Sequence, residues 1–167
     1  MKGWILVSSV LIGGVALIAA SGSAGHSCGL GAPHSRAYLH SYNLPSSGLA
    51  LEGYCPVAYF EANKPLLGKP AHQSTYNGVT YQFVSAEAKE LFDAKPERYI
   101  PAFGGWCAFG MSVNDKFPVD PRNYKIVEGR LMLFLKNRDV DARELWNQGD
   151  EQELIRKAEA HWDTVKS

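Results

Sequence analysis

The chain contains 167 residues, of which 46% are hydrophobic and 20% charged, a composition typical of a globular protein. Its 17 Lys and Arg side chains balance its 17 Asp and Glu side chains, so the sequence predicts no basic surface and gives no electrostatic support for nucleic-acid binding. Even without its first 24 residues the chain is long enough for one domain with a hydrophobic core.

The N-terminal segment 1–24 is typical of a secretory signal. Lys2 precedes an uncharged and mostly apolar run at 4–20, and small residues follow at 20–24. The alternative is an uncleaved membrane anchor formed by residues 4–20, a length at the lower limit for crossing a bilayer. Both interpretations put the domain outside the cytoplasm. We therefore expect a periplasmic or secreted protein that contacts a membrane only if the anchor is retained.

Residues 25–48 are rich in Gly, Ser, Pro and His and have neither a helical nor a strand period, so they predict a flexible linker. Cys28 lacks the aliphatic and small residues that precede a lipoprotein cysteine, and no lipidation is expected. His26, His34 and His40 match no chelating spacing and are interpreted as solvated. The domain is predicted at 49–167.

Two turn signals predict two hairpins in this domain. Asn77-Gly78 supplies the positive φ angles of a type I′ turn between the two short runs of 76–85. Glu128-Gly129 separates Tyr124–Val127 from Arg130–Leu135 in the same way. The run at 130–135 is almost continuously apolar, which predicts a central strand covered on both faces.

Helix signals follow each hairpin. Ser85 suits the N-cap of a helix over 85–94, and Pro96 suits the first turn of another. Asp139 is predicted to cap a helix that runs to Trp146. A final helix over about Glu151–Val165 carries one apolar stripe at helical spacing.

Three further segments are predicted from local composition. Ala50-Leu51 is expected to open a short strand, Pro56–Phe60 to form an apolar turn, and the glycine-bearing Ala108–Val113 to be an extended strand. Together the elements predict an α+β domain, with a small antiparallel sheet of two hairpins packed with short helices and a C-terminal amphipathic helix. The sequence by itself shows no internal repeat.

Several short motifs occur in order along residues 49–138. Gly-Tyr-Cys-Pro-Val-Ala-Tyr-Phe at 53–60 is followed by Tyr-x-Phe-x-Ser at 81–85, Pro-x-x-Tyr at 96–99 and Gly-Gly-Trp-Cys-Ala at 104–108. This order resembles the YHS domain family, in particular its extracytoplasmic branch of YHS domain-containing proteins and selenoproteins. The resemblance covers about half of the chain. It implies a metal role, which is inferred for the family from cysteine-bearing relatives in copper-handling proteins.

The chain departs from those relatives at the thiol positions. Where they carry cysteines, after Asp-Pro-Val and within Tyr-x-Phe-Cys-Ser-x-x-Cys, the matching residues here are Ala58, Val84 and Ala88. None of these side chains is a metal ligand. This chain therefore cannot bind a metal in the way that those relatives do.

Cys55 and Cys107 remain as candidate site residues, and three interpretations stay open. In the first interpretation the two cysteines form a disulfide, which an oxidising compartment permits. In the second interpretation they form a soft-metal site, for which Cu(I) is the natural ion. Met111, which would face the same way as Cys107 on an extended strand, is a candidate thioether ligand, and His72 is a further candidate ligand. In the third interpretation they form a dithiol that changes redox state with a partner protein. The bland alternative is that both are inert buried thiols and that Met111 and His72 are a core and a solvated residue.

Enzymatic catalysis finds no support in the sequence. It contains no nucleophile elbow, phosphate loop, His-Glu-x-x-His motif or dinucleotide fingerprint. The leading hypothesis is therefore an exported YHS-like domain that binds copper through Cys55 and Cys107. The alternatives are a thiol-disulfide redox protein, and a non-catalytic binding module that presents the aromatic Gly104–Met111 segment to a protein or a small ligand.

Overall fold

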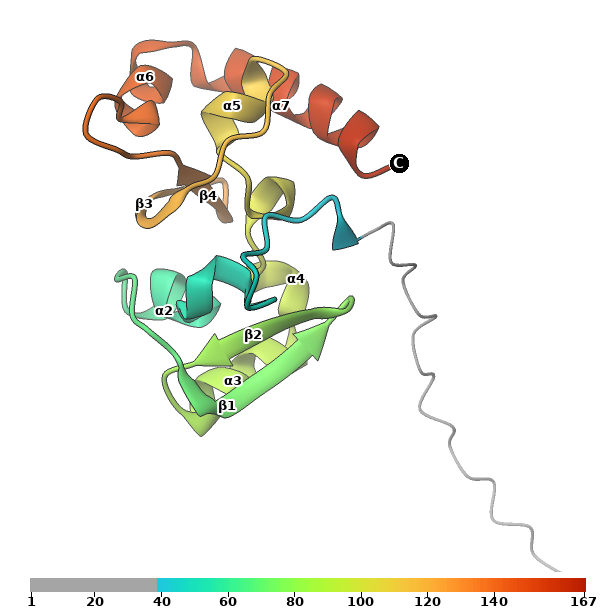
Figure 1. The fold of residues 1–167 in the computed structure, drawn as a ribbon. Helices are drawn as coiled ribbons and strands as arrows, with labels where there is room; N and C mark the ends of the chain where they lie inside the picture. Colours follow the sequence, from blue (N-terminus) through green and yellow to red (C-terminus); the bar gives the residue numbers. More distant parts are fainter. Residues whose placement is uncertain (1–38) are drawn as a thin grey trace, which may run out of the picture. The chain divides into compact units, whose positions relative to one another are not determined.

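The computed structural model describes residues 39–167 (Figure 1). The predictions made for the signal or anchor at 1–24, for Cys28 and for the linker as far as 38 lie outside the described residues. Within 39–167 no helix is long and apolar enough to cross a membrane. The described elements are, in chain order, η1 (Ala50–Gly53), α2 (Pro56–Glu61), β1 (Lys69–Tyr76), β2 (Val79–Phe83), α3 (Ala86–Ala94), α4 (Pro96–Tyr99), η2 (Ala102–Gly105), α5 (Ala108–Ser112), β3 (Asp120–Val127), β4 (Arg130–Phe134), α6 (Ala142–Gln148) and α7 (Glu151–Val165).

The predicted α+β class is confirmed, and both predicted hairpins are present. β1 pairs with β2 and β3 with β4, each antiparallel, as two separate two-stranded sheets rather than one. Asn77 and Gly78 have φ angles of 51° and 79°, and Glu128 and Gly129 have 52° and 74°, as the type I′ turns require. The strand at 130–134 is buried from Leu131 onward, as predicted, but it is not central in a sheet, because β3 is its one strand neighbour among the described residues.

The two hairpins belong to two copies of one unit, which corrects the expectation that the chain has no repeat. Each residue pair of β3–β4 lies 51 positions after its counterpart in β1–β2, from Asp120–Phe134 against Lys69–Phe83 to Val127–Arg130 against Tyr76–Val79. The same irregularity in register occurs after the first pair in both sheets. We call 50–99 the first repeat and 102–165 the second.

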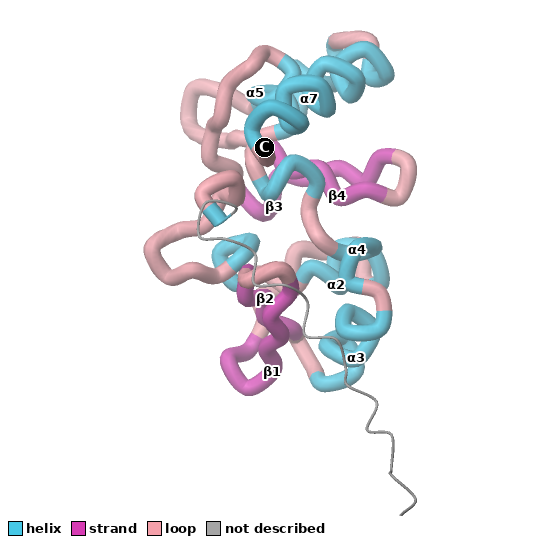
Figure 2. The backbone as a smooth tube through the Cα atoms, turned by 90° about the vertical axis from the view of Figure 1, so that its right-hand side faces the viewer, coloured by secondary structure: helices cyan, strands magenta, loops and turns pink. Residues whose placement is uncertain are grey.

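The segments before the hairpins repeat as well. Ala50-Leu-Glu-Gly-Tyr-Cys55 and Ala102-Phe-Gly-Gly-Trp-Cys107 each contain three successive residues with positive φ, at 51–53 and at 103–105. The amide of Cys55 donates to the carbonyl of Leu66, and the amide of Cys107 donates to that of Phe117. Figures 1 and 2 show the same order of short helix, hairpin and further helices in both repeats.

Each repeat carries its own cluster of buried side chains. The first cluster contains most buried residues of the first repeat, and the second contains those of α5, α6 and α7 with Met132 and Phe134 of β4. Successive side chains of β4 point to opposite clusters: Leu131 and Leu133 belong to the first, and Met132 and Phe134 belong to the second. Strand β4 is therefore shared by both cores, although only β3 pairs with it as a strand.

The predicted helix starts agree with the structure, with one correction. Ser85 caps α3 by accepting from the Ala88 amide, and Pro96 begins α4 as predicted. Asp141, not Asp139, caps α6, and its carboxylate accepts from the Arg143 amide. The final helix spans Glu151–Val165 as predicted, with Ile155 and Ala158 buried and Leu154 and Trp162 packed partly against the second cluster.

Three local predictions are wrong, since all three segments are helical. Ala50-Leu51 opens the 3₁₀ turn η1 rather than a strand, and Pro56–Glu61 is the α-helix α2 rather than a turn. Ala108–Ser112 is the α-helix α5 rather than a strand. In α5 no side chain is present at Gly110 to hold Phe117 away, and an added Cβ would lie 2.8 Å from the Phe117 ring. The glycine that favoured an extended strand thus permits a ring to pack against a helix.

Candidate functional site

The two candidate cysteines occupy equivalent positions in the two repeats. Cys55 precedes α2 and Cys107 precedes α5, each as the residue before the first helical one. Both are free thiols with 0% exposure. Cys55 belongs to the first cluster of buried side chains and Cys107 to the second.

Hydrogen bonds from the backbone fix the Cys107 sulfur. Its Sγ accepts from the amides of Gly110 at 3.5 Å and Leu135 at 3.3 Å. Burial raises the pKa of this thiol, and those backbone bonds oppose the shift only in part. A thiol held neutral in this way is a poor nucleophile and must lose a proton before it binds a metal.

The other two predicted ligands are divided between different places. Met111 is fully buried in the second cluster together with Cys107, and its amide donates to the Cys107 carbonyl at 2.9 Å, so the two residues are one helical turn apart instead of lying on a strand. His72 lies half-buried on β1, where it interacts electrostatically with Glu87. Across residues 39–167 no group of three or more His, Cys, Asp or Glu side chains is arranged to hold a metal ion. The structure thus brings Cys107 and Met111 together, and it separates both from His72 and from the cluster of Cys55.

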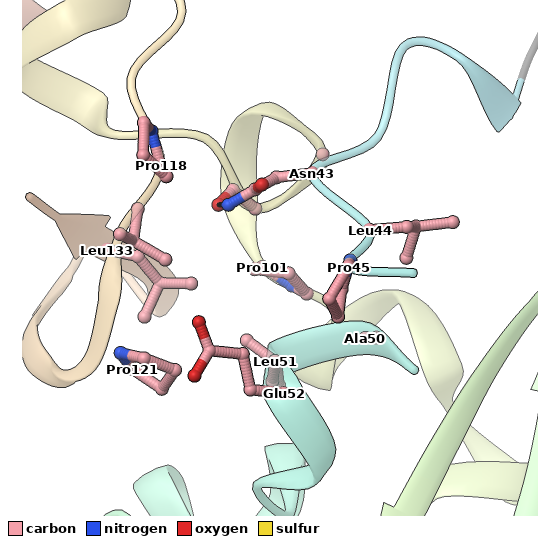
Figure 3. Close-up of a pocket in the computed structure, with 13 residues that line it drawn as sticks. Asn43, Leu44, Pro45, Ala50, Leu51, Glu52, Pro101, Pro118, Pro121 and Leu133 are labelled. Carbon is pink, nitrogen blue, oxygen red and sulfur yellow. Dashed lines mark hydrogen bonds between the residues drawn. The ribbon is translucent and has the colours of Figure 1, made fainter. Parts of the chain in front are cut away.

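A cavity lies where the two repeats meet. Its volume is about 190 Å³, and it is lined by residues of η1 and η2, by the chain at 43–45, and by Pro101, Pro118, Val119, Pro121 and Leu133. Figure 3 shows Pro101, Pro118 and Pro121 on its walls together with Leu51 and Leu133. We call this cavity the inter-repeat pocket.

Glu52 is the one charged residue that lines the inter-repeat pocket. In Figure 3 its carboxylate lies beside Pro121 and Leu133. Within residues 39–167 no hydrogen bond and no ion pair engages this carboxylate. Its charge helps to raise the pKa of Arg122, but the main cause is the hydrogen bond from Arg122 to Asp120, whose carboxylate pairs with that guanidinium at 2.9 Å. The cation near Glu52 is therefore already neutralised by another acid.

The backbone at Glu52 is strained. Its φ of 52° lies in the left-handed region, which costs a residue with a Cβ about 1–2 kcal/mol. The second repeat uses Gly104 at the equivalent position, with a φ of 59°. The first repeat thus keeps a charged side chain where its copy has avoided the strain with glycine.

The pocket walls are held by bonds that cross between the repeats and the preceding segment. Tyr59, fully buried on α2, donates its hydroxyl to the carbonyl of Pro121 at 2.8 Å. Asn43 donates its side-chain amide to the Gly105 carbonyl at 3.0 Å, and its backbone amide donates to the Gly104 carbonyl at 2.9 Å. Burial raises the pKa of Tyr59 far above its ordinary value, so its hydroxyl stays a donor. The pocket is in this way preformed.

No known protein identifies this site. Comparisons of the chain with family models, with curated proteins and with solved structures find no match. The resemblance to the YHS family therefore stays a prediction.

The prediction of candidate residues from the sequence missed Glu52 and Tyr59 and the three prolines. Tyr59 lies within the motif at 53–60 and Glu52 lies directly before it, and neither residue type in that position predicts a ligand site. The one available signal was the pair of hexapeptides 50–55 and 102–107, in which Glu52 stands opposite Gly104. That comparison marks the position at which the two copies differ in charge.

Proposed function

We propose that the chain is a non-catalytic binding module of YHS type, with its ligand site in the inter-repeat pocket. The observation that carries this proposal is a preformed cavity at the junction of two equivalent loops, η1 and η2, with apolar walls and one carboxylate that no other group of residues 39–167 engages. Sites for small ligands are typically concave and mostly apolar, with a few polar groups that orient the ligand.

The size of the pocket limits the ligand. Pockets for drug-sized molecules measure roughly 300–1,000 Å³, whereas this one measures about 190 Å³. A compact molecule therefore fits better than a peptide or a nucleotide. Binding through preformed walls needs little ordering of the protein, which favours affinity for a small partner.

An NMR titration of the full-length chain with a library of small fragments tests the proposal. We expect fragments that bind to shift the amides of Leu51, Gly104 and Leu133, which line the pocket. A Pro118→Trp variant should fill the pocket and abolish these shifts. Leu67→Trp is the matched control, because Leu67 is the repeat equivalent of Pro118 and is 63% exposed away from the pocket lining. If no fragment shifts these amides, or if both variants behave alike, the pocket is not a binding site.

A soft-metal site is the second candidate, and the placement of Cys107 with Met111 in one buried cluster favours it at Cys107, whereas Cys55 belongs to the other cluster. A thiolate and a thioether are the ligands that Cu(I) selects. Equilibrium dialysis with Cu(I) distinguishes this candidate, since the wild type should take up copper that a Cys55→Ala/Cys107→Ala variant does not. Equal uptake by both would remove it. The same thiols would serve in a redox role, which single-cysteine variants that trap a partner through a mixed disulfide would support.

A further inference from the structure

The inter-repeat pocket combines one carboxylate with hydrocarbon walls. Leu51, Pro101, Pro121 and Leu133 present apolar surface, and Glu52 is the charged group among the lining residues. An anion in this pocket would meet Glu52 as a like charge, and a neutral apolar molecule would leave the carboxylate with water as its partner. A cation with an apolar body satisfies both kinds of surface.

The acceptors around the pocket also suit a cation that donates hydrogen bonds. The Pro121 carbonyl already accepts from Tyr59, and the carbonyls of Gly104 and Gly105 accept from Asn43. The side-chain oxygen of Asn43 remains as an acceptor, because its amide nitrogen makes the bond to Gly105. A protonated amine has several N–H donors and no acceptor, and so it matches a carboxylate and an amide oxygen.

The comparison of the two repeats gives an independent argument. Gly104 is required in the second repeat, since a Cβ there would lie 2.6 Å from the Trp162 ring. No such crowding explains Glu52, whose left-handed φ costs free energy that glycine would save. Strained residues that persist in a fold concentrate at ligand sites.

From these observations we infer that the inter-repeat pocket binds a small organic ammonium ion, a protonated amine on a compact hydrocarbon body, with Glu52 as its counter-ion. The inference rests on the proposed function and adds the chemical class of the ligand. Glu52 accepts the N–H groups at the mouth of the pocket while the hydrocarbon body contacts the proline and leucine walls. Arg122 pairs with Asp120 through its Nε and one Nη, and no ion pair joins it to Glu52 within residues 39–167.

Three probes of similar shape and different charge test the inference by NMR titration of the full-length chain: cyclohexylammonium, cyclohexanol and cyclohexanecarboxylate. We expect cyclohexylammonium to bind about tenfold or more tightly than cyclohexanol, as a charge-assisted hydrogen bond predicts, and the carboxylate to bind most weakly. The Glu52→Gln variant should lose this preference while it keeps the affinity for cyclohexanol.

Glu128→Gln is the matched control. Glu128 is also exposed and has the same φ of 52°, but it lies in the β3–β4 turn and does not line the pocket. Glu128→Gln should therefore keep the preference for the ammonium ion, and Glu52→Gly should lose it in a protein that is at least as stable as the wild type.

The outcomes separate the two proposals. If cyclohexanol or the carboxylate shifts the pocket amides as strongly as the ammonium ion, or if Glu52→Gln keeps the preference, the pocket is a site but the ligand class is wrong. If none of the probes shifts the amides of Leu51, Gly104 and Leu133, both the ligand class and the proposed function are wrong.

Discussion

The hydroxyl of Tyr59 donates to the backbone carbonyl of Pro121 across the junction of the two repeats, at 2.8 Å and with Tyr59 fully buried. The Tyr59 ring also meets Tyr124 edge to face, with ring centroids 4.9 Å apart. A helix of the first repeat thereby holds the first residues of β3, which form one wall of the inter-repeat pocket. The geometry of the pocket depends on this contact.

Replacing Tyr59 by Phe should destabilise the fold by about 1–2 kcal/mol, because the buried Pro121 carbonyl loses its donor while the ring stays. Chemical denaturation followed by tryptophan fluorescence measures the change. Tyr99→Phe is the control, since the Tyr99 hydroxyl donates to the exposed carboxylate of Glu61, which water can satisfy. Equal losses in both variants would mean that the bond to Pro121 has no special importance.

A side chain at Gly104 would clash with neighbouring atoms, whereas a side chain at Gly129 would not. A Cβ at Gly104 would lie 2.6 Å from the Trp162 ring and 3.1 Å from the Ser41 carbonyl oxygen, whereas a Cβ at Gly129 meets nothing within 4 Å. Both glycines have positive φ, at 59° and 74°. Gly129→Ala should therefore cost about 1 kcal/mol from backbone strain alone, and Gly104→Ala about 1–3 kcal/mol more from overpacking. Thermal denaturation of both variants checks the difference, and similar losses would contradict the crowding at Trp162.

Local signals in the sequence predicted the parts of the fold that local chemistry determines. Asn77-Gly78 and Glu128-Gly129 specify their turns through positive φ, and Ser85 specifies a helix start through its side-chain oxygen. The segment 108–112 was mispredicted because Gly110 suits either a strand or a close contact with Phe117, and only tertiary structure decides between them. A local sequence pattern cannot predict such a tertiary contact.

The repeat and the pocket needed the structure for a different reason. The two copies share backbone conformation and hydrogen bonds, but their side chains differ: Tyr59, four residues after Cys55, corresponds to Met111, four residues after Cys107. Side-chain identity therefore conceals the relation. The pocket exists only where the two copies meet. Glu52 is therefore marked only by its comparison with Gly104, and Cys55 and Cys107, which their motifs singled out, lie at equivalent positions in two different clusters.

The repeats also predict substitutions that stabilise the chain. Asn77 occupies the left-handed position of the first hairpin turn, and Glu128 occupies the same position in the second. Asn tolerates this conformation better than Glu, so Glu128→Asn should raise the free energy of unfolding by about 0.5–1 kcal/mol. Asn77→Glu is the reciprocal variant and should lower it by a similar amount. Urea denaturation measures both, and changes of the same sign would contradict the equivalence of the two turns.

Asp141 should make the fold sensitive to acid. Hydrogen bonds from Lys136, Asn123 and the Arg143 amide lower the pKa of this carboxyl from 3.8 to about 2. The unfolded chain then binds a proton that the folded chain does not, so stability is present above about pH 4 and is lost as the pH falls toward 2. Denaturation curves between pH 2 and pH 6 should show this fall, and Asp141→Asn should flatten it. A control variant, Asp139→Asn, changes an exposed acid outside the cap and should leave the fall unchanged.

Cys107 should impose the opposite dependence in alkali. Burial raises its pKa above the ordinary 9.0, so the unfolded chain releases a proton that the folded chain retains, and stability falls as the pH rises above 9. Cys107→Ala should remove part of this fall. Because both Cys55 and Cys107 have 0% exposure, a thiol reagent should modify them in the native protein only as fast as the protein opens. Rapid modification of either thiol at neutral pH in the folded chain would contradict this burial and would favour the redox role over the binding module.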